Sequence, residues 1–371
     1  MKHSAIAILL TAAGALVIGG CGGSADVGGF PEVPERYVTA LEPEANIDSV
    51  AVAPSVAGEP SLLFATAKAT DVIKVFDASS GAELLELGGS GASPEDFQRP
   101  NGVAVANDLL IVVERDNRRV SIRSIPDYRL LGTFGDDVLR NPYGLWVQEL
   151  EKDRYRLFVT DAYEMPDESV PPNEELDERV RQWQFAVLRD SEGRSIAIDS
   201  QFEKSFGDTT DAGALRVVES IFGDPAHDRL LIAEEDEDPV TGLVIKVYDL
   251  DGRYKGEQLG KGIFKAQAEG IALYACEDGS GYWLSTDQAK GRTVYHLFDR
   301  KTLEHVGAFS GELTANTDGV WLATDNIPAF ASGAFFAVHD DQAVSAFDWM
   351  DIVAALKLNT CESERSAGNQ E

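Results

Sequence analysis

The sequence predicts an all-β protein, a six-bladed β-propeller. From residue 47 onward the chain reads as short runs rich in β-branched and aromatic residues, such as VIKVFD, LLIVVE, RLLIAE and AFFAVHD. Such runs are typical of strands, and turn dipeptides such as Asp251-Gly252 and Asp278-Gly279 lie between them. Long amphipathic helices are absent, apart from a short one expected around residues 351–358. These observations indicate a repeated unit of strands.

Each unit has a small-residue strand, a more apolar strand, a third strand that ends near Asp, and a weaker fourth strand. The units begin at Asp48, Asn101, Tyr143, Glu219, Glu269 and Asp318. Propeller blades of four strands recur about every 40–50 residues, which matches this spacing except between the third and fourth starts. We therefore expect an insertion in the third blade. A pair of β-sandwiches is the alternative, and the regular period disfavours it.

The N-terminus reads as a targeting segment. Residues 1–20 combine a basic start with an apolar run too short for a comfortable membrane span, as in a signal peptide. Ile18-Gly19-Gly20-Cys21 resembles the lipobox of bacterial lipoproteins, in which Cys21 carries the lipid; a plain secretory signal is the alternative. We expect a flexible tether over 21–46, the propeller over 47–358 and a tail over 359–371. The predicted location is the bacterial cell envelope, anchored by lipid to the outer membrane and facing the periplasm or the surface.

The chain is strongly acidic, with 63 Asp and Glu against 32 Lys and Arg and a net charge of −31. Such a surplus disfavours nucleic acid as a partner. It also repels phosphate esters unless a bound cation reverses the local field. Cys276 and Cys361 could form a disulfide in an oxidising compartment or remain two free thiols. The His residues are scattered, so no His-based zinc site is expected.

The propeller makes a geometric prediction. The start of each innermost strand and the end of each second strand open on the same face of the disc, at the mouth of the central channel. The unit starts therefore form an inner ring. The second-strand ends form an outer ring of Lys68, Glu114-Arg115, Asp161, Glu234-Glu235-Asp236, Asp287 and His339-Asp340-Asp341.

Several carboxylates would thus meet at the channel mouth. The candidate metal ligands are Asp48, Glu219, Glu235, Glu269 and Asp318. Carboxylates without His or Cys prefer hard ions, Ca²⁺ above all. Lys68, Arg115 and Tyr143 would border the cluster and suit an anionic, phosphorylated small molecule. Salt bridging around a water-filled channel is the alternative.

The insertion at residues 161–183, DAYEMPDESVPPNEELDERVRQW, would leave from the same face. It is acidic and interrupted by Pro, with a short helix expected over 172–183. We expect a lid or a loop that binds a protein partner, and a disordered excursion is the alternative.

From Val218 to Asp341 the chain resembles the β-propeller phytase family. The motifs VES…DRLLIAEEDED, AEGIALYACEDGSGYWLSTDQ and NTDGVWL…GAFFAVHDD carry the resemblance, in order and at similar spacing. The family comprises calcium-dependent phosphomonoesterases that act on inositol hexakisphosphate. The resemblance implies calcium-binding acids at Glu219, Glu235, Glu269 and Asp318. It also implies that Lys68, Arg115 and Tyr143 hold substrate phosphates, and that Glu235 and Glu219 belong to the catalytic set.

Five positions depart from the family pattern. Where the family has an Asp-Asp-Pro triplet, this chain has Ile47-Asp48-Ser49. Ala104 and Gln267 each occupy a position at which the family has an Asp. Asp161 replaces a Gly that precedes a Lys in the family, and Ser220 replaces another Gly. Some calcium ligands and one phosphate-binding Lys are therefore missing.

Two other functions remain open on the sequence. RPNGVAV and RNPYGLWV resemble NHL-type repeats, so the chain could be a non-catalytic, lipid-anchored binding propeller. It could also be a lactonase-type hydrolase with one calcium held by Glu, Asn101 and Asp. A phytase requires several calcium ions, whereas these alternatives require one or none.

Overall fold

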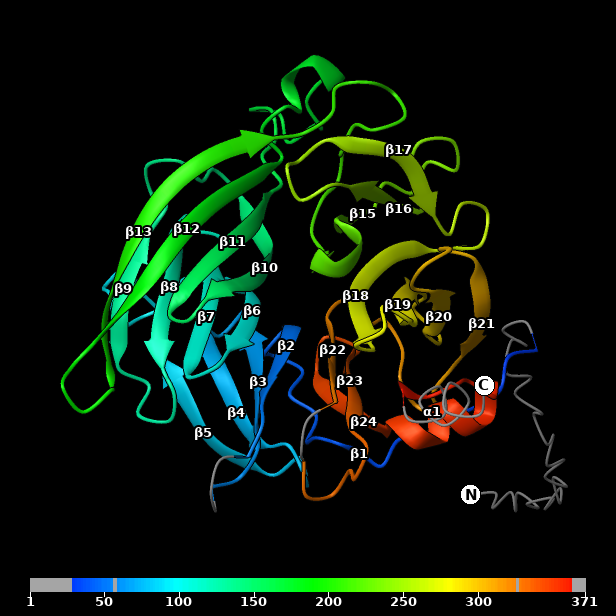
Figure 1. The fold of residues 1–371 in the computed structure, drawn as a ribbon, viewed down its shortest axis with the longest axis horizontal. Coiled ribbons are helices and arrows are strands. Elements are labelled where there is room, and N and C mark those ends of the chain that lie inside the picture. Colours follow the sequence, from blue (N-terminus) through cyan, green and yellow to red (C-terminus); the bar gives the residue numbers. More distant parts are fainter. Residues whose placement is uncertain (1–28, 56–58, 325–326, 362–371) are drawn as a thin grey trace, which may run out of the picture.

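The computed structural model describes residues 29–55, 59–324 and 327–361. It contains six four-stranded antiparallel sheets arranged around a central axis, which confirms the predicted six-bladed β-propeller (Figure 1). The predicted signal peptide, Cys21 and the end of the tail lie outside the described residues. None of the helices in the described ranges is long and apolar enough to cross a membrane.

The blades follow one another along the chain, and each begins with its innermost strand. Blade 1 comprises β2 (Ile47–Ala53), β3 (Leu62–Ala67), β4 (Val72–Asp77) and β5 (Glu83–Gly88). Blade 2 comprises β6 (Pro100–Ala106), β7 (Leu109–Glu114), β8 (Arg119–Ser124) and β9 (Leu130–Phe134). Blade 3 comprises β10 (Pro142–Glu151), β11 (Arg154–Asp161), β12 (Val180–Arg189) and β13 (Ser195–Phe206). Blade 4 comprises β14 (Ile221–Asp224), β15 (Arg229–Glu234), β16 (Val244–Tyr248) and β17 (Tyr254–Leu259). Blade 5 comprises β18 (Gln267–Ala275), β19 (Gly281–Gln288), β20 (Val294–Asp299) and β21 (His305–Phe309). Blade 6 comprises β22 (Val320–Ala323), β23 (Ala334–His339), β24 (Ala343–Asp348) and β1 (Tyr37–Val38).

The middle strands are apolar along their whole length because each blade is covered on both faces by its neighbours. All residues of β3 and β7 are buried, and the core consists of clusters that alternate with the blades around the ring. The outermost strands have one open edge and carry polar residues, as in β5, which is mostly exposed. Continuous apolar runs are therefore the middle strands, and the weaker fourth run of each unit is the outer strand.

The two ends of the chain close the ring. β1 pairs antiparallel with β24, with Tyr37 opposite Ala346, so the sixth blade takes its outer strand from the N-terminal segment. Val33 is buried, and the Glu35 carboxylate accepts hydrogen bonds from the backbone N–H groups of Leu313 and Thr314. The prediction of a tether up to residue 46 is therefore wrong for the described residues 29–46, because strand pairing with the far end of the chain leaves no local sequence signal.

Three blades have a buried ion pair at the end of the second strand, and a fourth has an Asp–His contact there. An acid there contacts a base on the third strand: Glu114–Arg119 (2.8 Å), Asp161–Arg181 (3.0 Å), Glu234–Lys246 (2.9 Å) and Asp287–His296 (3.7 Å). The acids also accept hydrogen bonds from the backbone that enters the blade, as Glu234 does from the N–H groups of Arg216 and Val217. Most of the predicted outer ring is thus structural, because its charges are neutralised within each blade.

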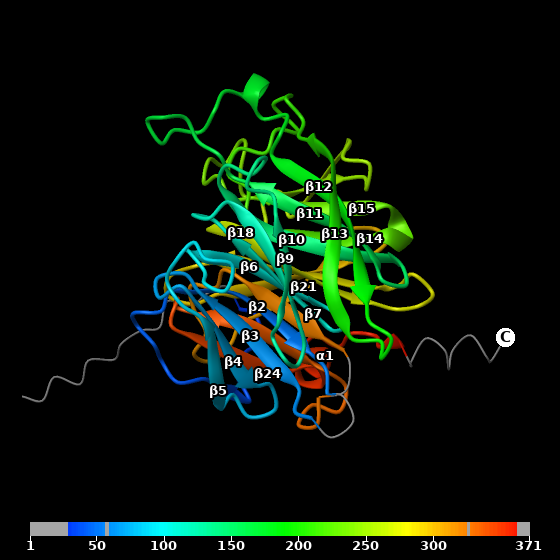
Figure 2. The same ribbon diagram turned by 90° about the vertical axis from the view of Figure 1, so that its left-hand side faces the viewer.

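The insertion after β11 is ordered. Within it the structure shows a 3-10 turn, Asn173–Glu175, and β12 already begins at Val180, so the helix predicted over 172–183 is wrong. Leu176 is fully buried. The Arg179 guanidinium donates to the backbone carbonyls of Leu215 (3.0 Å) and Arg216 (2.6 Å) and tethers the loop to the next blade. Within the described residues the loop is not a disordered excursion. Figure 2 shows the long strand β13 beside β9; β13 ends at Phe206, opposite Val180, where the insertion meets β12.

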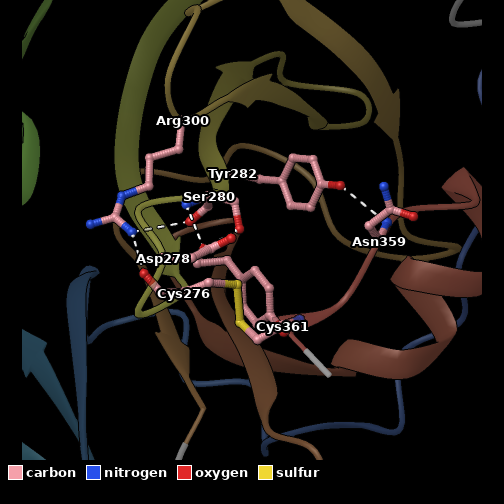
Figure 3. The surroundings of a disulfide bond; sticks show 8 residues. Cys276, Asp278, Ser280, Tyr282, Arg300, Asn359 and Cys361 are labelled. Carbon is pink, nitrogen blue, oxygen red and sulfur yellow. Dashed lines mark hydrogen bonds between the residues drawn. A yellow bond between two sulfur atoms is a disulfide. The ribbon is translucent and has the colours of Figure 1, made fainter. Parts of the chain in front are cut away.

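The C-terminal segment packs across the last two blades. Helix α1 spans Trp349–Leu356, close to the predicted 351–358, and Asp348 caps it by accepting a hydrogen bond from the Met350 N–H group (2.9 Å). Cys276 and Cys361 form a disulfide, which decides between the two alternatives that the sequence leaves open (Figure 3). The disulfide joins the tail to the turn after β18.

Replacing Lys246 by Met should lower the free energy of unfolding by about 3–5 kcal/mol, because Glu234 would remain as an unpaired buried charge. Equilibrium unfolding in urea measures this loss. The double variant K246M/E234Q should regain part of the stability, since it leaves no unpaired buried charge and the amide oxygen can still accept one of the two backbone hydrogen bonds. A loss below about 1 kcal/mol in K246M would contradict a structural role for the pair.

Candidate metal centre

The innermost strands of all six blades converge on a central cavity of about 170 Å³. Asp48, Tyr143, Glu219, Glu269 and Asp318 line it, and each stands at or just before the start of an innermost strand. These are the positions that the period of the sequence predicts. Asn101 occupies the equivalent position on β6. Five of the six predicted inner-ring residues therefore line the cavity, and on blade 2 the residue that follows Asn101, Gly102, lines it.

Close contact between neighbouring blades fixes the direction of these side chains. A glycine follows the mouth residue in four of the blades, and a Cβ at Gly102 or Gly319 would lie 2.5 Å from the carbonyl oxygen of the mouth residue of the next blade, Tyr143 or Asp48. Because only glycine allows this approach, the backbone is held against the next blade. The side chain before the glycine then has to project at the mouth.

Three glutamates meet on one side of the mouth. Carboxylate oxygens of Glu219, Glu235 and Glu269 all lie within 4.8 Å of one another. Glu235 and Glu269 are 3% and 4% exposed. No ion pair within the described residues neutralises any of the three.

Ionisation of these buried glutamates is energetically unfavourable. Burial, and then the nearby Asp48 carboxylate, raises the pKa of Glu219 to about 8. Burial, and then Glu219, raises the pKa of both Glu235 and Glu269 well above the usual range. Without a cation the group therefore retains protons near neutral pH.

These residues fit a hard cation. The donors are carboxylate oxygens from two adjacent blades, with no His or Cys nearby, which is the ligand set that Ca²⁺ prefers. A bound cation would also relieve the repulsion between the carboxylates, which contributes to their raised pKa values. Glu219, Glu235 and Glu269 are the residues that would hold it.

Asp48 has a different role from the one predicted. It forms a buried ion pair with Lys68, with 2.6 Å between Oδ1 and Nζ, and so its charge is already neutralised. Burial alone would lower the pKa of Lys68, but Asp48 outweighs burial and raises it above its usual value. Lys68 is therefore charged at every physiological pH.

Lys68 and Tyr143 join this pair to the glutamates. The Lys68 ammonium donates to the Tyr143 hydroxyl (3.0 Å) and lies over the ring, 5.5 Å from its centroid. The Tyr143 side chain is also close enough to Glu219 to lower the pKa of that carboxyl. Burial, and then the surrounding carboxylates, raises the pKa of Tyr143 well above its usual value, so it remains a neutral phenol. A cation and a hydroxyl donor thus stand directly beside the candidate metal ligands.

Asp318 lies at the edge of the cluster. Burial, and then Asp48, raises its pKa to about 9. Its carboxylate accepts a hydrogen bond from the Gln288 amide and shares another with Asp341. Gln288 was missed in the sequence, although it directly follows Asp287 at the end of a second strand. Asp318 is thus held by protein partners beside the three glutamates.

Arg115 does not join the group. Its guanidinium contacts Asp116 (2.7 Å) at the surface, and no contact in the described part of the chain links it to the glutamates. Arg99 is instead close enough to Glu219 to lower the pKa of that carboxyl. Sequence reasoning missed Arg99 because it lies two residues before the predicted blade start.

The acidic run at residues 234–238 divides between two roles. Glu234 belongs to the structural pair of blade 4, whereas Glu235 belongs to the glutamate cluster. Asp236 and Asp238 accept hydrogen bonds within their own loop, from the Thr241 hydroxyl (2.9 Å) and the Val240 N–H group (2.8 Å). Only one of these acids contributes to the candidate metal site.

Part of the chain matches a model of a known protein family. The family model described as Phytase matches residues 211–338. These residues form a phytase-like segment. It contains Glu219, Glu235, Glu269 and Asp318, whereas Lys68, Asn101 and Tyr143 precede it. The phytase-like segment therefore supplies the carboxylate side of the mouth.

The remaining comparisons are with curated proteins and with solved structures. No curated protein matches the chain. Among solved structures, the Cps50 (Swd1) β-propeller domain of Myceliophteria thermophila is 10% identical with a TM-score of 0.44, covering 84% of this chain and 99% of that one. Hydrazine synthase of Kuenenia stuttgartiensis is 12% identical with a TM-score of 0.45, covering 87% and 82%.

Two adjacent glutamates give a matched pair of variants. E235Q should weaken calcium binding at least tenfold while the calcium-free protein keeps or gains thermal stability, because a repelling carboxylate is removed. E234Q should do the reverse, with unchanged calcium affinity and lower stability, because Lys246 loses its partner. Calorimetric calcium titration and thermal melting measure both effects. The same loss of calcium affinity in both variants would contradict the division of the acidic run.

Without calcium, the free energy of unfolding should fall as the pH rises toward 9. In the folded protein the pKa of Glu219 is raised from 4.5 to about 8 and that of Asp318 from 3.8 to about 9. The folded state therefore binds more protons than the unfolded chain in this range, and the stability is lost as these groups ionise.

The variant E219Q should flatten this decline by up to about 1.4 kcal/mol per pH unit, the effect of one proton. Urea unfolding in chelator from pH 5 to pH 9 provides the slopes. Saturating calcium should abolish the difference between the slopes, and equal slopes for E219Q and the parent protein in chelator would refute the assignment.

Proposed function

We propose that this chain is a calcium-dependent phosphomonoesterase of the phytase-like type, which hydrolyses phytate or a related phosphate ester at the channel mouth. One observation carries the proposal. Buried carboxylates that have no ion-pair partner among the described residues lie beside a permanently charged lysine, and Tyr143 accepts a hydrogen bond from Lys68 and lies close to Glu219. The match of residues 211–338 to the Phytase family model supports the same activity.

The two sides of the mouth have complementary chemistry. Calcium bound by Glu219, Glu235 and Glu269 would neutralise phosphate oxygens and increase the acidity of a water molecule. Lys68 offers an ammonium to a phosphate oxygen, and its pairing with Asp48 fixes the direction of that ammonium. Tyr143, as a neutral phenol, can donate a hydrogen bond to the same group. Positioned donors of this kind stabilise charge that develops on a phosphoryl group.

The acidic surface makes the cation necessary. With a net charge of −31, the protein repels phosphate esters unless positive charge is concentrated at the site. Lys68 supplies one positive charge, and a calcium ion on three glutamates supplies the other. We propose that substrate binding and calcium binding are therefore coupled, and that nucleic acid is not a partner.

The proposed location is the bacterial cell envelope, where lipid on Cys21 would hold the protein at the membrane. The disulfide between Cys276 and Cys361 supports an oxidising compartment. The ordered, acidic insertion beside the mouth is the surface that we propose for a protein partner.

The test is phosphate release from phytate by a soluble form that begins at Gly22, with calcium or with chelator. Release should require calcium and should fall at least a hundredfold in E235Q and in Lys68→Gln, since each variant removes one side of the site. E234Q, once its lower stability is allowed for, should keep its activity. Absence of release, with calcium still raising the melting temperature, would make the protein a calcium-stabilised binding propeller. Hydrolysis of a lactone with one bound calcium would favour the lactonase alternative.

A further inference from the structure

The start of β6 holds a buried amide without a partner. Asn101 is 0% exposed, and neither its Oδ1 nor its Nδ2 atom makes a hydrogen bond to any described residue. An unsatisfied buried amide lowers stability, so a side chain of this kind indicates a ligand or an ordered water. Its backbone, by contrast, is fully engaged, since the Asn101 carbonyl accepts a hydrogen bond from the Thr66 hydroxyl (2.8 Å).

The position of Asn101 in its blade places the amide at the mouth. In their own blades, Asp48 and Tyr143 occupy the equivalent position and line the cavity. Gly102, the next residue, also lines the cavity and packs against the Tyr143 carbonyl, as the glycines of other blades do against their neighbours. Around the mouth, the position of Asn101 on blade 2 therefore follows blade 1, which carries the Lys68–Asp48 pair, and precedes blade 3, which carries Tyr143.

Arg99 adds an incompletely paired cation to the same edge. Its Nε atom is buried and has no hydrogen-bond partner among the described residues. Its backbone has a φ of 49°, an uncommon value for arginine, and its N–H group donates to Asp71 (2.7 Å), which holds this conformation. Its charge reaches Glu219 across the mouth. Arg99 therefore lies two residues before the mouth position of blade 2 and still has a hydrogen bond to give.

The mouth thus has two sides of opposite character. Carboxylates from blades 4 and 5 form one side. Donors from blades 1 to 3, namely Lys68, Arg99, Asn101 and Tyr143, form the other. Donors with free hydrogen-bonding capacity that face a cation-binding carboxylate cluster suit a ligand rich in acceptor oxygens, which can accept from the donors and bind the cation at the same time.

We propose that Asn101 and Arg99 form the oxyanion-binding edge of the site and, together with Lys68, hold the phosphoryl group of a phosphate monoester opposite the glutamates. This inference rests on the proposed function and assigns the residues that select the ligand. The Asn101 amide donates through Nδ2, and Arg99 adds a charge-assisted hydrogen bond through Nε.

The test measures binding of inorganic phosphate, by calorimetry at saturating calcium, to the same soluble form. The variant N101L should bind phosphate at least tenfold more weakly, with calcium affinity unchanged and an equal or higher melting temperature, because an unsatisfied buried amide is replaced by an apolar group of similar size. R99Q should weaken phosphate binding about tenfold. R99K should recover part of it, since it restores the charge but not the Nε donor.

Asn117 provides the matched control. Its amide donates to Glu114 (2.6 Å) and to the Gly91 carbonyl (3.0 Å), so N117L should lower the melting temperature without changing phosphate affinity. If N101L does not fold, the smaller variant N101S should show the same loss of phosphate binding.

Unchanged phosphate affinity in the Asn101 and Arg99 variants overturns the inference. Loss of calcium affinity in N101L also overturns it, because Asn101 would then be a cation ligand through Oδ1. Phosphate binding that depends on both residues, without release from phytate by the parent protein, would leave the inference intact and refute only the proposed function. If the calcium-loaded parent protein binds no phosphate, both are overturned.

Discussion

The site depends on closure of the ring. β1 pairs with β24, and this pairing joins residues near the start of the described chain to residues near its end. With the ring closed, each innermost strand packs against the next, and Gly102 and Gly319 allow the backbones to approach at the mouth. Side chains from six separate blades then converge on one cavity. Without closure, the same residues would lie on the edges of independent sheets.

Charge at this face is divided between structure and function. Glu114, Asp161, Glu234 and Asp287 are buried with a base on the neighbouring strand, and such pairs hold the blade tops and their incoming loops in place. Glu219, Glu235 and Glu269 have no such partner. The protein thus neutralises one group of buried acids internally and leaves the other to an external cation. This difference in pairing, more than the number of acids, marks the candidate metal centre.

The donor side of the mouth likewise combines groups that are paired within the protein with groups that have no partner among the described residues. Lys68 is fixed by Asp48 and donates a hydrogen bond to Tyr143, which lies close to Glu219. Asn101 and Arg99 retain hydrogen-bonding atoms that no described residue satisfies. Unsatisfied donors beside unpaired carboxylates cost stability in the free protein. A divalent cation bound to the carboxylates, together with an oxyanion bound to the donors, would remove both sources of instability.

The sequence by itself determined the fold and the inner ring. The period of strand runs identified six blade starts, and the positions at Asp48, Tyr143, Glu219, Glu269 and Asp318 do line the cavity. Periodicity succeeds here because each blade is built from local hairpins. Only the tertiary structure decided which charges are free. The partner of Glu234 is twelve residues away on another strand, that of Arg115 is its own neighbour, and the partner of β1 is on the last blade. Such pairings depend on register and closure, which leave no local pattern, so the tether, the helix in the insertion and the role of Arg115 could not be predicted correctly.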